Sequence, residues 1–143
     1  MTVERRALYT SVALSCVTET LATALLLELR SRAQDAAVRA TLHEVLRDEV
    51  DHARLGWAHL AAVGRTGAAA WLAPYIPAML RAALGGQLGP VDAVATEPDL
   101  SGYGLLPTAE VFRIVRAVAG DVLFPGLERF GVGTADARAS LPS

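Results

Sequence analysis

The apolar positions of the first 63 residues recur alternately three and four apart, which is the spacing of one face of an α-helix. One stripe runs from about residue 3 to residue 33 and a second from about 36 to 63, so the pattern predicts two long helices. Thr2 and Asp35 precede these stripes and can cap a helix N-terminus, and Gly64 can end the second helix. Because the link over residues 31–35 is short, we expect the two helices to be antiparallel neighbours.

The pattern weakens after Gly64. Residues 67–84 predict a third helix, which Pro74 and Pro77 must kink or delay because proline lacks the amide hydrogen that a helix interior needs. Residues 85–107 are rich in Gly, Pro and Asp and predict a long loop, of the kind that serves as a lid, binding segment or interface. A fourth helix is predicted from residue 108, with a stop near Pro125 and an accessory region reaching residue 130; residues 131–143 predict a loose tail.

Composition supports one all-α domain spanning residues 1–143. The chain is 52% hydrophobic, mostly Ala, Leu and Val, which suits packed helices better than sheets. The net charge is −2 and all 13 basic residues are Arg without a basic patch, so we expect no nucleic-acid partner. The single cysteine, Cys16, cannot form an internal disulfide, which favours a reducing cytoplasm.

The apolar run after Arg5 and Arg6 has features of a signal peptide or a membrane span. Polar residues interrupt this run, and helical periodicity continues through it to Leu29. A membrane span needs about 20 mostly apolar residues. We therefore expect neither a signal peptide nor a membrane partner.

Three titratable residues, Glu19, Glu49 and His52, occupy stripe positions where apolar residues belong. Burial of a carboxylate costs several kcal/mol unless it is paired or bound to a metal. Glu19 lies 15 residues before the turn near Gln34 and Glu49 lies 15 after it, so both should stand roughly 22 Å from the turn. His52 is one turn beyond Glu49 on the same face. Two carboxylates and an imidazole that converge in this way suit a first-row metal such as iron or manganese.

The pattern formed by Glu19 and the segment Asp48-Glu49-Val50-Asp51-His52 resembles the ferritin-like di-iron carboxylate superfamily, over about residues 8–63. The resemblance implies a ferritin-like helical hairpin over residues 3–63 that forms half of a four-helix bundle. It further implies that Glu19, Glu49 and His52 ligate metal and that Asp48 orients a ligating histidine. Two irons would occupy each complete site, with manganese as the alternative.

A complete site of this class uses two Glu-x-x-His motifs, and the chain has one. The remaining histidine on the second helix near this motif, His43, falls on the far side from His52. Two copies related by a two-fold axis would supply four Glu and two His, so we expect a homodimer or higher homo-oligomer that completes the bundle. Half-ferritins such as the encapsulated ferritins are similar in this respect, although their capsule-targeting tail is not recognisable in residues 134–143.

The resemblance implies activation of O₂ or peroxide, by an oxidase of ferroxidase or rubrerythrin-like type. Because the cysteine pairs of a rubrerythrin are absent, an electron donor would be external. Two alternatives remain open at this point. One is a di-iron oxygenase acting on a small organic substrate, and the other is a non-enzymatic scaffold or one half of a hetero-oligomer.

Three further residues near this motif have structural interpretations. His59 lies seven residues past His52, about 10 Å along the helix, and is interpreted as a core histidine. Cys16 is interpreted as a small buried hydrophobe. Gly56 either leaves space for a pocket beside the metals or permits close helix packing.

Overall fold

The computed structural model describes residues 1–65, 67–85 and 100–141. Apart from one isolated bridge between Leu100 and Leu105, the regular structure of these described residues is helical. The all-α class expected from composition and periodicity is confirmed.

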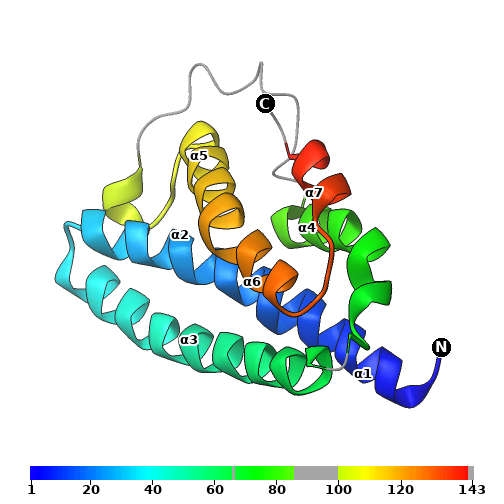
Figure 1. Cartoon of the computed structure of the whole chain (residues 1–143). Coiled ribbons are helices and arrows are strands. Elements are labelled where there is room, and N and C mark those ends of the chain that lie inside the picture. The colour runs from blue at the N-terminus through cyan, green and yellow to red at the C-terminus, as the bar shows by residue number, and fades with distance from the viewer. Residues whose placement is uncertain (66, 86–99, 142–143) are drawn as a thin grey trace.

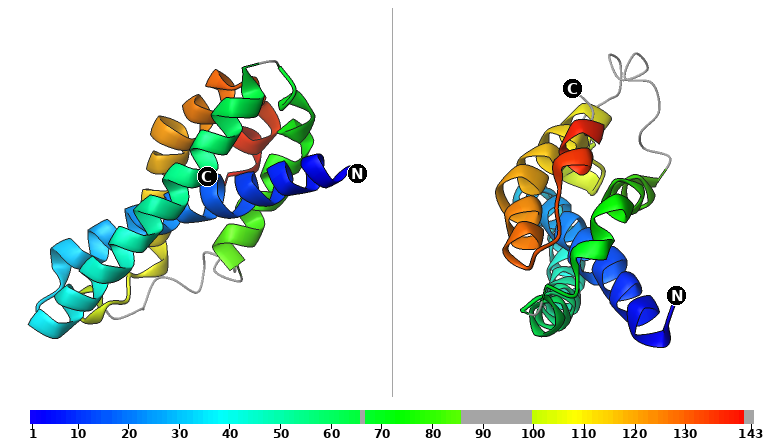
Figure 2. Two further views of the ribbon diagram at one scale, coloured as in Figure 1. Left: turned by 90° about the horizontal axis from the view of Figure 1, so that it is seen from below. Right: turned by 45° about the vertical axis from the view of Figure 1, so that its right-hand side comes forward.

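One continuous helix of 30 residues opens the chain. It consists of α1 (Val3–Ser11), a π-helical segment (Val12–Thr18) and α2 (Glu19–Arg32). The Thr2 side chain accepts a hydrogen bond from the Arg5 amide at 3.3 Å, as expected of an N-cap. The first turns of α1 are exposed and project beyond the body of the molecule in all views (Figures 1 and 2).

The second long helix, α3 (Ala36–Gly64), packs beside α2 and runs back along it (Figure 1). The Asp35 carboxylate accepts hydrogen bonds from the amides of Ala37 and Val38 at 2.7 and 3.1 Å, which confirms its predicted capping role. The helix ends at Gly64, as expected, and Arg65 follows as its C-terminal cap. A Cβ on Gly64 would lie 2.7 Å from the Cβ of Phe130, so glycine here allows the C-terminal part of the chain to approach α3.

The third helical region begins late. Residues Ala70–Tyr75 form a 3₁₀ segment that contains Pro74, and α4 (Ile76–Leu84) follows with Pro77 in its first turn. Proline is tolerated in the first turn because the amide there has no intrahelical partner. The predicted delay is therefore observed. Residues 86–99 of the predicted loop lie outside the described residues, whereas Ser101–Tyr103 form a short 3₁₀ turn.

The fourth helical region is longer than a stop at Pro125 would allow. It comprises α5 (Thr108–Val118), a second π-helical segment (Ala119–Leu123) and α6 (Phe124–Arg129). Pro125 falls in the first turn of α6, directly after the π-helical segment. Proline has no amide hydrogen to donate to a helical hydrogen bond. The wider turns of the π-helical segment leave such bonds unmade, so Pro125 can continue the helix at this point.

The expectation of a loose tail from residue 131 is wrong for the described part of that segment. Residues Ala135–Ser140 form α7, which packs beside α4. Val132 and Ala137 are almost fully buried, and Thr134 is buried against Glu128. Arg138 adds a contact over the ring of Phe124, with 4.7 Å between the guanidinium carbon and the ring centroid.

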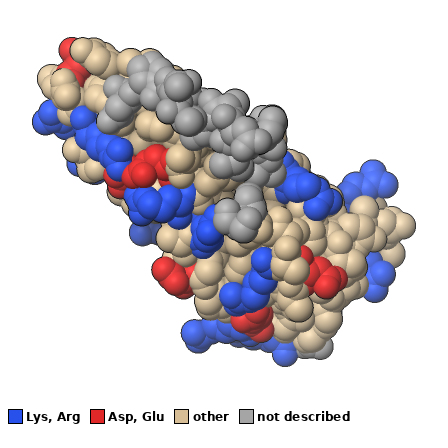
Figure 3. Space-filling view, turned by 90° about the horizontal axis from the view of Figure 1, so that it is seen from above, with Lys and Arg blue, Asp and Glu red and all other residues tan. Residues whose placement is uncertain are grey.

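The core lies between the long hairpin and the upper layer of α4, α5, α6 and α7 (Figure 1). Its largest fully buried side chains come from α3, the 3₁₀ segment, α4 and the α5–α6 region: Leu60, Leu72, Ile76, Leu123, Phe124 and Leu127. On the face seen in Figure 3, arginine and acidic side chains are interspersed, so no field of a single sign dominates this face. The first helix joins this core through one face, with Leu8, Val12, Cys16, Val17 and Leu21 buried.

The helix Val3–Arg32 is long and apolar enough to cross a membrane, judged by length and composition alone. Its most apolar 18-residue window has a mean hydropathy of 1.6, and 22% of that window is buried. A core helix of this hydropathy is usually mostly buried. The hairpin therefore keeps exposed apolar surface, including Leu14 and Leu27 at 55% and 50% exposure.

Candidate metal centre

Glu19 is the first residue of α2 and follows the π-helical segment Val12–Thr18 directly. The Thr18 hydroxyl donates to the carbonyl oxygen of Ala13 at 2.9 Å, which satisfies one of the carbonyls that the wider turn releases. π-Helical turns are rare and occur often at functional sites. The apolar spacing of this segment is that of an ordinary α-helix, so the sequence pattern does not predict the π-helical turns.

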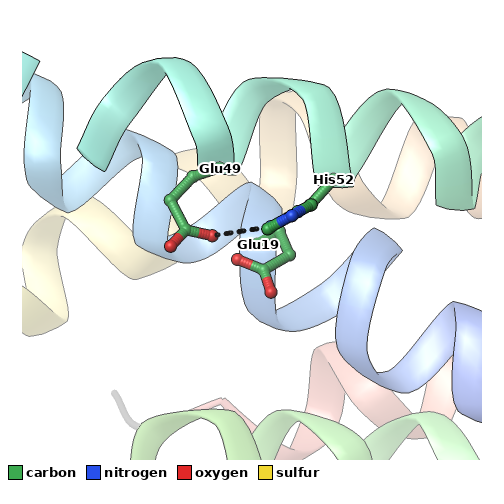
Figure 4. Close-up of side chains that lie close together, drawn as sticks. All are labelled: Glu19, Glu49 and His52. Carbon is green, nitrogen blue, oxygen red and sulfur yellow. Dashed lines mark ion pairs between the residues drawn. The ribbon is translucent and has the colours of Figure 1, made fainter. Parts of the chain in front are cut away.

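Glu49 and His52 lie one turn apart on α3 and face Glu19 on α2 (Figure 4). One ligand atom from each of the three residues can be chosen so that all lie within 4.8 Å of one another. The Nδ1 of His52 lies 3.8 Å from Oε2 of Glu49. The sequence argument that placed the two carboxylates at equal distances from the turn thus led to residues that the fold does bring together.

The two carboxylates lie in a costly environment. Burial, and next the adjacent carboxyl of Glu49, raise the pKa of Glu19 to about 7, although His52 acts in the opposite direction. Oε2 of Glu49 is buried and accepts no hydrogen bond from any described residue. A buried acceptor without a partner costs about 1–3 kcal/mol. A cation bound between the carboxylates would remove both penalties.

Gly56 lies one turn beyond His52, where the two long helices are in close contact. A Cβ on Gly56 would lie 2.4 Å from the Cβ of Ser15 and 3.0 Å from the Ser15 carbonyl carbon. Of the two interpretations of this glycine, close helix packing is the one that the structure supports. Trp57, the next residue, donates from its indole nitrogen to the hydroxyl of Thr20 at 3.1 Å and fixes the same pair of helices.

The remaining candidates lie apart from this cluster. Asp48 and His43 are exposed on α3, and neither belongs to the group of converging ligand atoms. His59 is half-buried further along α3. Cys16 is fully buried, as interpreted, and burial raises the pKa of its thiol to about 12. The orienting role of Asp48 therefore stays a prediction, one that a single copy of the chain does not test.

Thr23 is a residue near the site that sequence reasoning did not single out. Its hydroxyl is buried and has no hydrogen-bond partner among the described residues. It lies four residues after Glu19 on α2, so it follows Glu19 on nearly the same face. The sequence feature that could have identified Thr23 is its position one helical turn after Glu19, a carboxylate on the apolar stripe.

Comparison with known proteins gave no match: no family model, no curated protein and no solved structure resembles the chain significantly. The case for a function therefore rests on the residues and their geometry.

Proposed function

We propose that Glu19, Glu49 and His52 are one half of a di-metal site, most simply a di-iron site, and that a second copy of the chain supplies the other half. The observation that carries this proposal is the convergence of three ligand atoms within 4.8 Å around a buried Glu49 oxygen, which accepts no hydrogen bond from the described residues and lies 3.8 Å from Nδ1 of His52. Exposed acidic residues meet by chance on many surfaces. A buried Glu49 oxygen that no described residue hydrogen-bonds is harder to explain without a cation.

The donor set fits a first-row metal in number and distance. Bonds of about 2.0–2.2 Å to nitrogen and oxygen allow two donors on one ion to be at most about 4.4 Å apart. The observed limit of 4.8 Å needs side-chain shifts of only a few tenths of an ångström. Two carboxylates and one imidazole are the ligands that iron and manganese share.

The site is open on one side. The side chain of His52 is 62% exposed, whereas that of Glu49 is 23% exposed. Val45 and Leu55 lie on the same face of α3 as His52 by helical spacing, and they are 39% and 70% exposed. Apolar side chains beside half a ligand set suit a two-fold interface, because a second copy would cover them and bring its own Glu19, Glu49 and His52.

A bound pair of irons would supply the two-electron reduction of O₂ or peroxide, which is the chemistry of an oxidase of ferroxidase or rubrerythrin-like type. The residues of this chain have separate parts in it. The negative charges of Glu19 and Glu49 would offset the positive charge of the metals in a partly desolvated site. Because the pKa of Glu19 is raised to about 7, its carboxyl must lose a proton before it can bind a metal below that pH. His52, from the exposed side, is the neutral ligand whose other ring nitrogen can meet a group from the second copy.

The test is metal content in the intact protein. After loading with ferrous iron without oxygen and removal of free metal, we expect about one iron per chain and a dimer by sedimentation. Glu49→Ala should lose the metal. The matched control is Glu44→Ala on the same helix, because Glu44 is exposed and pairs only with Arg47 among the described residues, at 3.3 Å. This control should bind iron as the parent does.

Three results would count against the proposal. Retention of iron by the folded Glu49→Ala variant would place the metal elsewhere. A parent protein that binds neither iron nor manganese would instead support the non-enzymatic scaffold. If iron binds at a stoichiometry near one per chain but the protein sediments as a monomer, the half-site assembly is wrong.

A further inference from the structure

A separate cavity opens where α1, the last turns of α3 and the start of the 3₁₀ segment meet. Its volume is about 640 Å³, within the range of about 300–1,000 Å³ that small-molecule sites occupy. Leu8, Val63, Ala68 and Trp71 give it mostly apolar walls, and His59 stands among them. Sites for small molecules usually combine such apolar walls with a few polar groups that fix orientation.

His59 is the polar group inside this cavity. The residue is half-buried, and its imidazole makes no hydrogen bond within the described part of the chain. The interpretation of His59 as a hydrogen-bonded core histidine is therefore wrong for the described structure, in which His59 lines the cavity. It lies seven residues beyond His52, about 10 Å along α3, so a molecule beside it need not touch the ligand cluster.

The described lining of the cavity also includes one acid and one base, the exposed residues Glu4 and Arg5. The guanidinium carbon of Arg5 lies 5.2 Å from the ring centroid of Trp71. This cation–π contact pairs the charge of Arg5 with the indole ring at the wall of the cavity. Since the opposite charges of Glu4 and Arg5 offset each other, the cavity offers no net charge to an ion. Transfer of an ion into apolar walls without a paired charge is costly.

We propose that this cavity binds a neutral amphiphile, a small molecule with an apolar body and one hydroxyl or carbonyl group that hydrogen-bonds to His59. The apolar walls select the body, the imidazole selects the polar group, and the absence of a net charge among the described lining residues selects against an ionised ligand. The proposal does not depend on the metal site.

The probes are 1-octanol and octanoate, which share a chain but differ in the charge of the head. Titration calorimetry on the intact protein at neutral pH should show binding of 1-octanol, with octanoate weaker by about tenfold or more. His59→Leu should weaken the binding of 1-octanol by about tenfold, which is the loss expected for one hydrogen bond. It should also reduce the difference in affinity between 1-octanol and octanoate. Binding of octanoate as tight as or tighter than that of 1-octanol would overturn the proposal.

Filling the cavity is the second measurement. Ala68 is exposed on the cavity wall, so Ala68→Phe should abolish 1-octanol binding without a core change. Ala62→Phe is the matched control, because Ala62 is exposed on α3 and does not line the cavity, and it should bind as the parent does. Equal binding by both variants would overturn the site. So would a change in the oligomeric state of Ala68→Phe, measured by sedimentation, without a loss of 1-octanol binding, because the cavity would then seat a second copy.

Discussion

The backbones of Gly56 and Ser15 approach so closely that a Cβ on Gly56 would lie 2.4 Å from the Cβ of Ser15. This contact joins α3 to the π-helical segment, within one turn of both Glu19 and His52. The separation of the two helices at the candidate metal centre therefore depends on the absence of one methyl group.

Gly56→Ala should destabilise the protein by about 1–3 kcal/mol, because a helix must move to admit the added methyl group. This loss would occur although alanine is the better helix former by about 1 kcal/mol. Urea denaturation measures it, and iron content should fall as well because Glu49 would move away from Glu19.

Gly120→Ala is the control for this substitution. Gly120 also lies in a helical stretch, and nothing lies within 4 Å of an added Cβ there. It should leave stability unchanged or raise it by up to about 1 kcal/mol. Equal losses at both positions would show that the tight contact at Gly56 is not the cause.

The metal-free protein should become more stable as pH is lowered from 7 towards 5. The folded pKa of Glu19 is about 7, above its ordinary value of 4.5, so in this window the folded state holds a proton that the unfolded state releases. Stability from this group is full below about pH 4.5 and is lost as pH rises through 7. Thermal unfolding at several pH values measures the slope, which should flatten in Glu19→Gln.

This window avoids the opposing effect of Glu110. Hydrogen bonding to Arg113 and Arg32 lowers the pKa of Glu110 to about 2, so its contribution is present above pH 4.5 and is lost only as pH falls further. A metal-free Glu19→Gln variant that keeps the parent's slope between pH 5 and 7 would assign the effect to another group.

Glu110 should matter more to stability than an ordinary surface acid. Its side chain is 22% exposed and joins α5 to α2 through Arg32, while Arg113 donates to it twice, at 2.7 and 3.1 Å. We expect Glu110→Ala to cost about 1–2 kcal/mol in chemical denaturation, since it leaves charged donors without their acceptor. Glu44→Ala, which removes an exposed pair with Arg47, should change stability by less than about 0.5 kcal/mol.

Cys16 should resist alkylation in the folded protein. Its side chain is fully buried and burial raises the pKa of the thiol to about 12, so the reactive thiolate is scarce. The rate of labelling by iodoacetamide at neutral pH should follow the unfolded fraction as urea is added. Fast labelling without urea would show that the contact between the π-helical segment and α3 opens locally.

The hairpin was the predictable part of the fold. Thr2 and Asp35 cap their helices as their side-chain chemistry suggests, and the equal spacing of Glu19 and Glu49 from the turn brings them together. These features are local or depend only on helical geometry, so the sequence pattern carries them.

The features that were missed depend on tertiary packing. The contact of Phe130, distant in sequence, with the backbone of Gly64 at the end of α3 could not be predicted from local pattern. The polar segment after Gly131 folds into α7 because Val132 and Ala137 find buried positions beside α4. Whether the second half of the metal site comes from another copy cannot be read from spacing either, since a pattern in one chain does not specify a contact between two.

The π-helical segment before Glu19 gives the long helix one residue more than its turns require. Removing one residue from Val12–Thr18 would restore ordinary turns and leave the helix before it facing nearly the same way relative to Glu19, because the wider π-helical turns hold the extra residue. The buried face that includes Leu8 would stay on the core, and Glu19 would stay opposite Glu49. In evolutionary terms, the extra residue could be gained or lost without separating the core from the carboxylate pair, and what it changes is the set of backbone carbonyls left without a helical partner before Glu19, of which the Thr18 hydroxyl reaches that of Ala13.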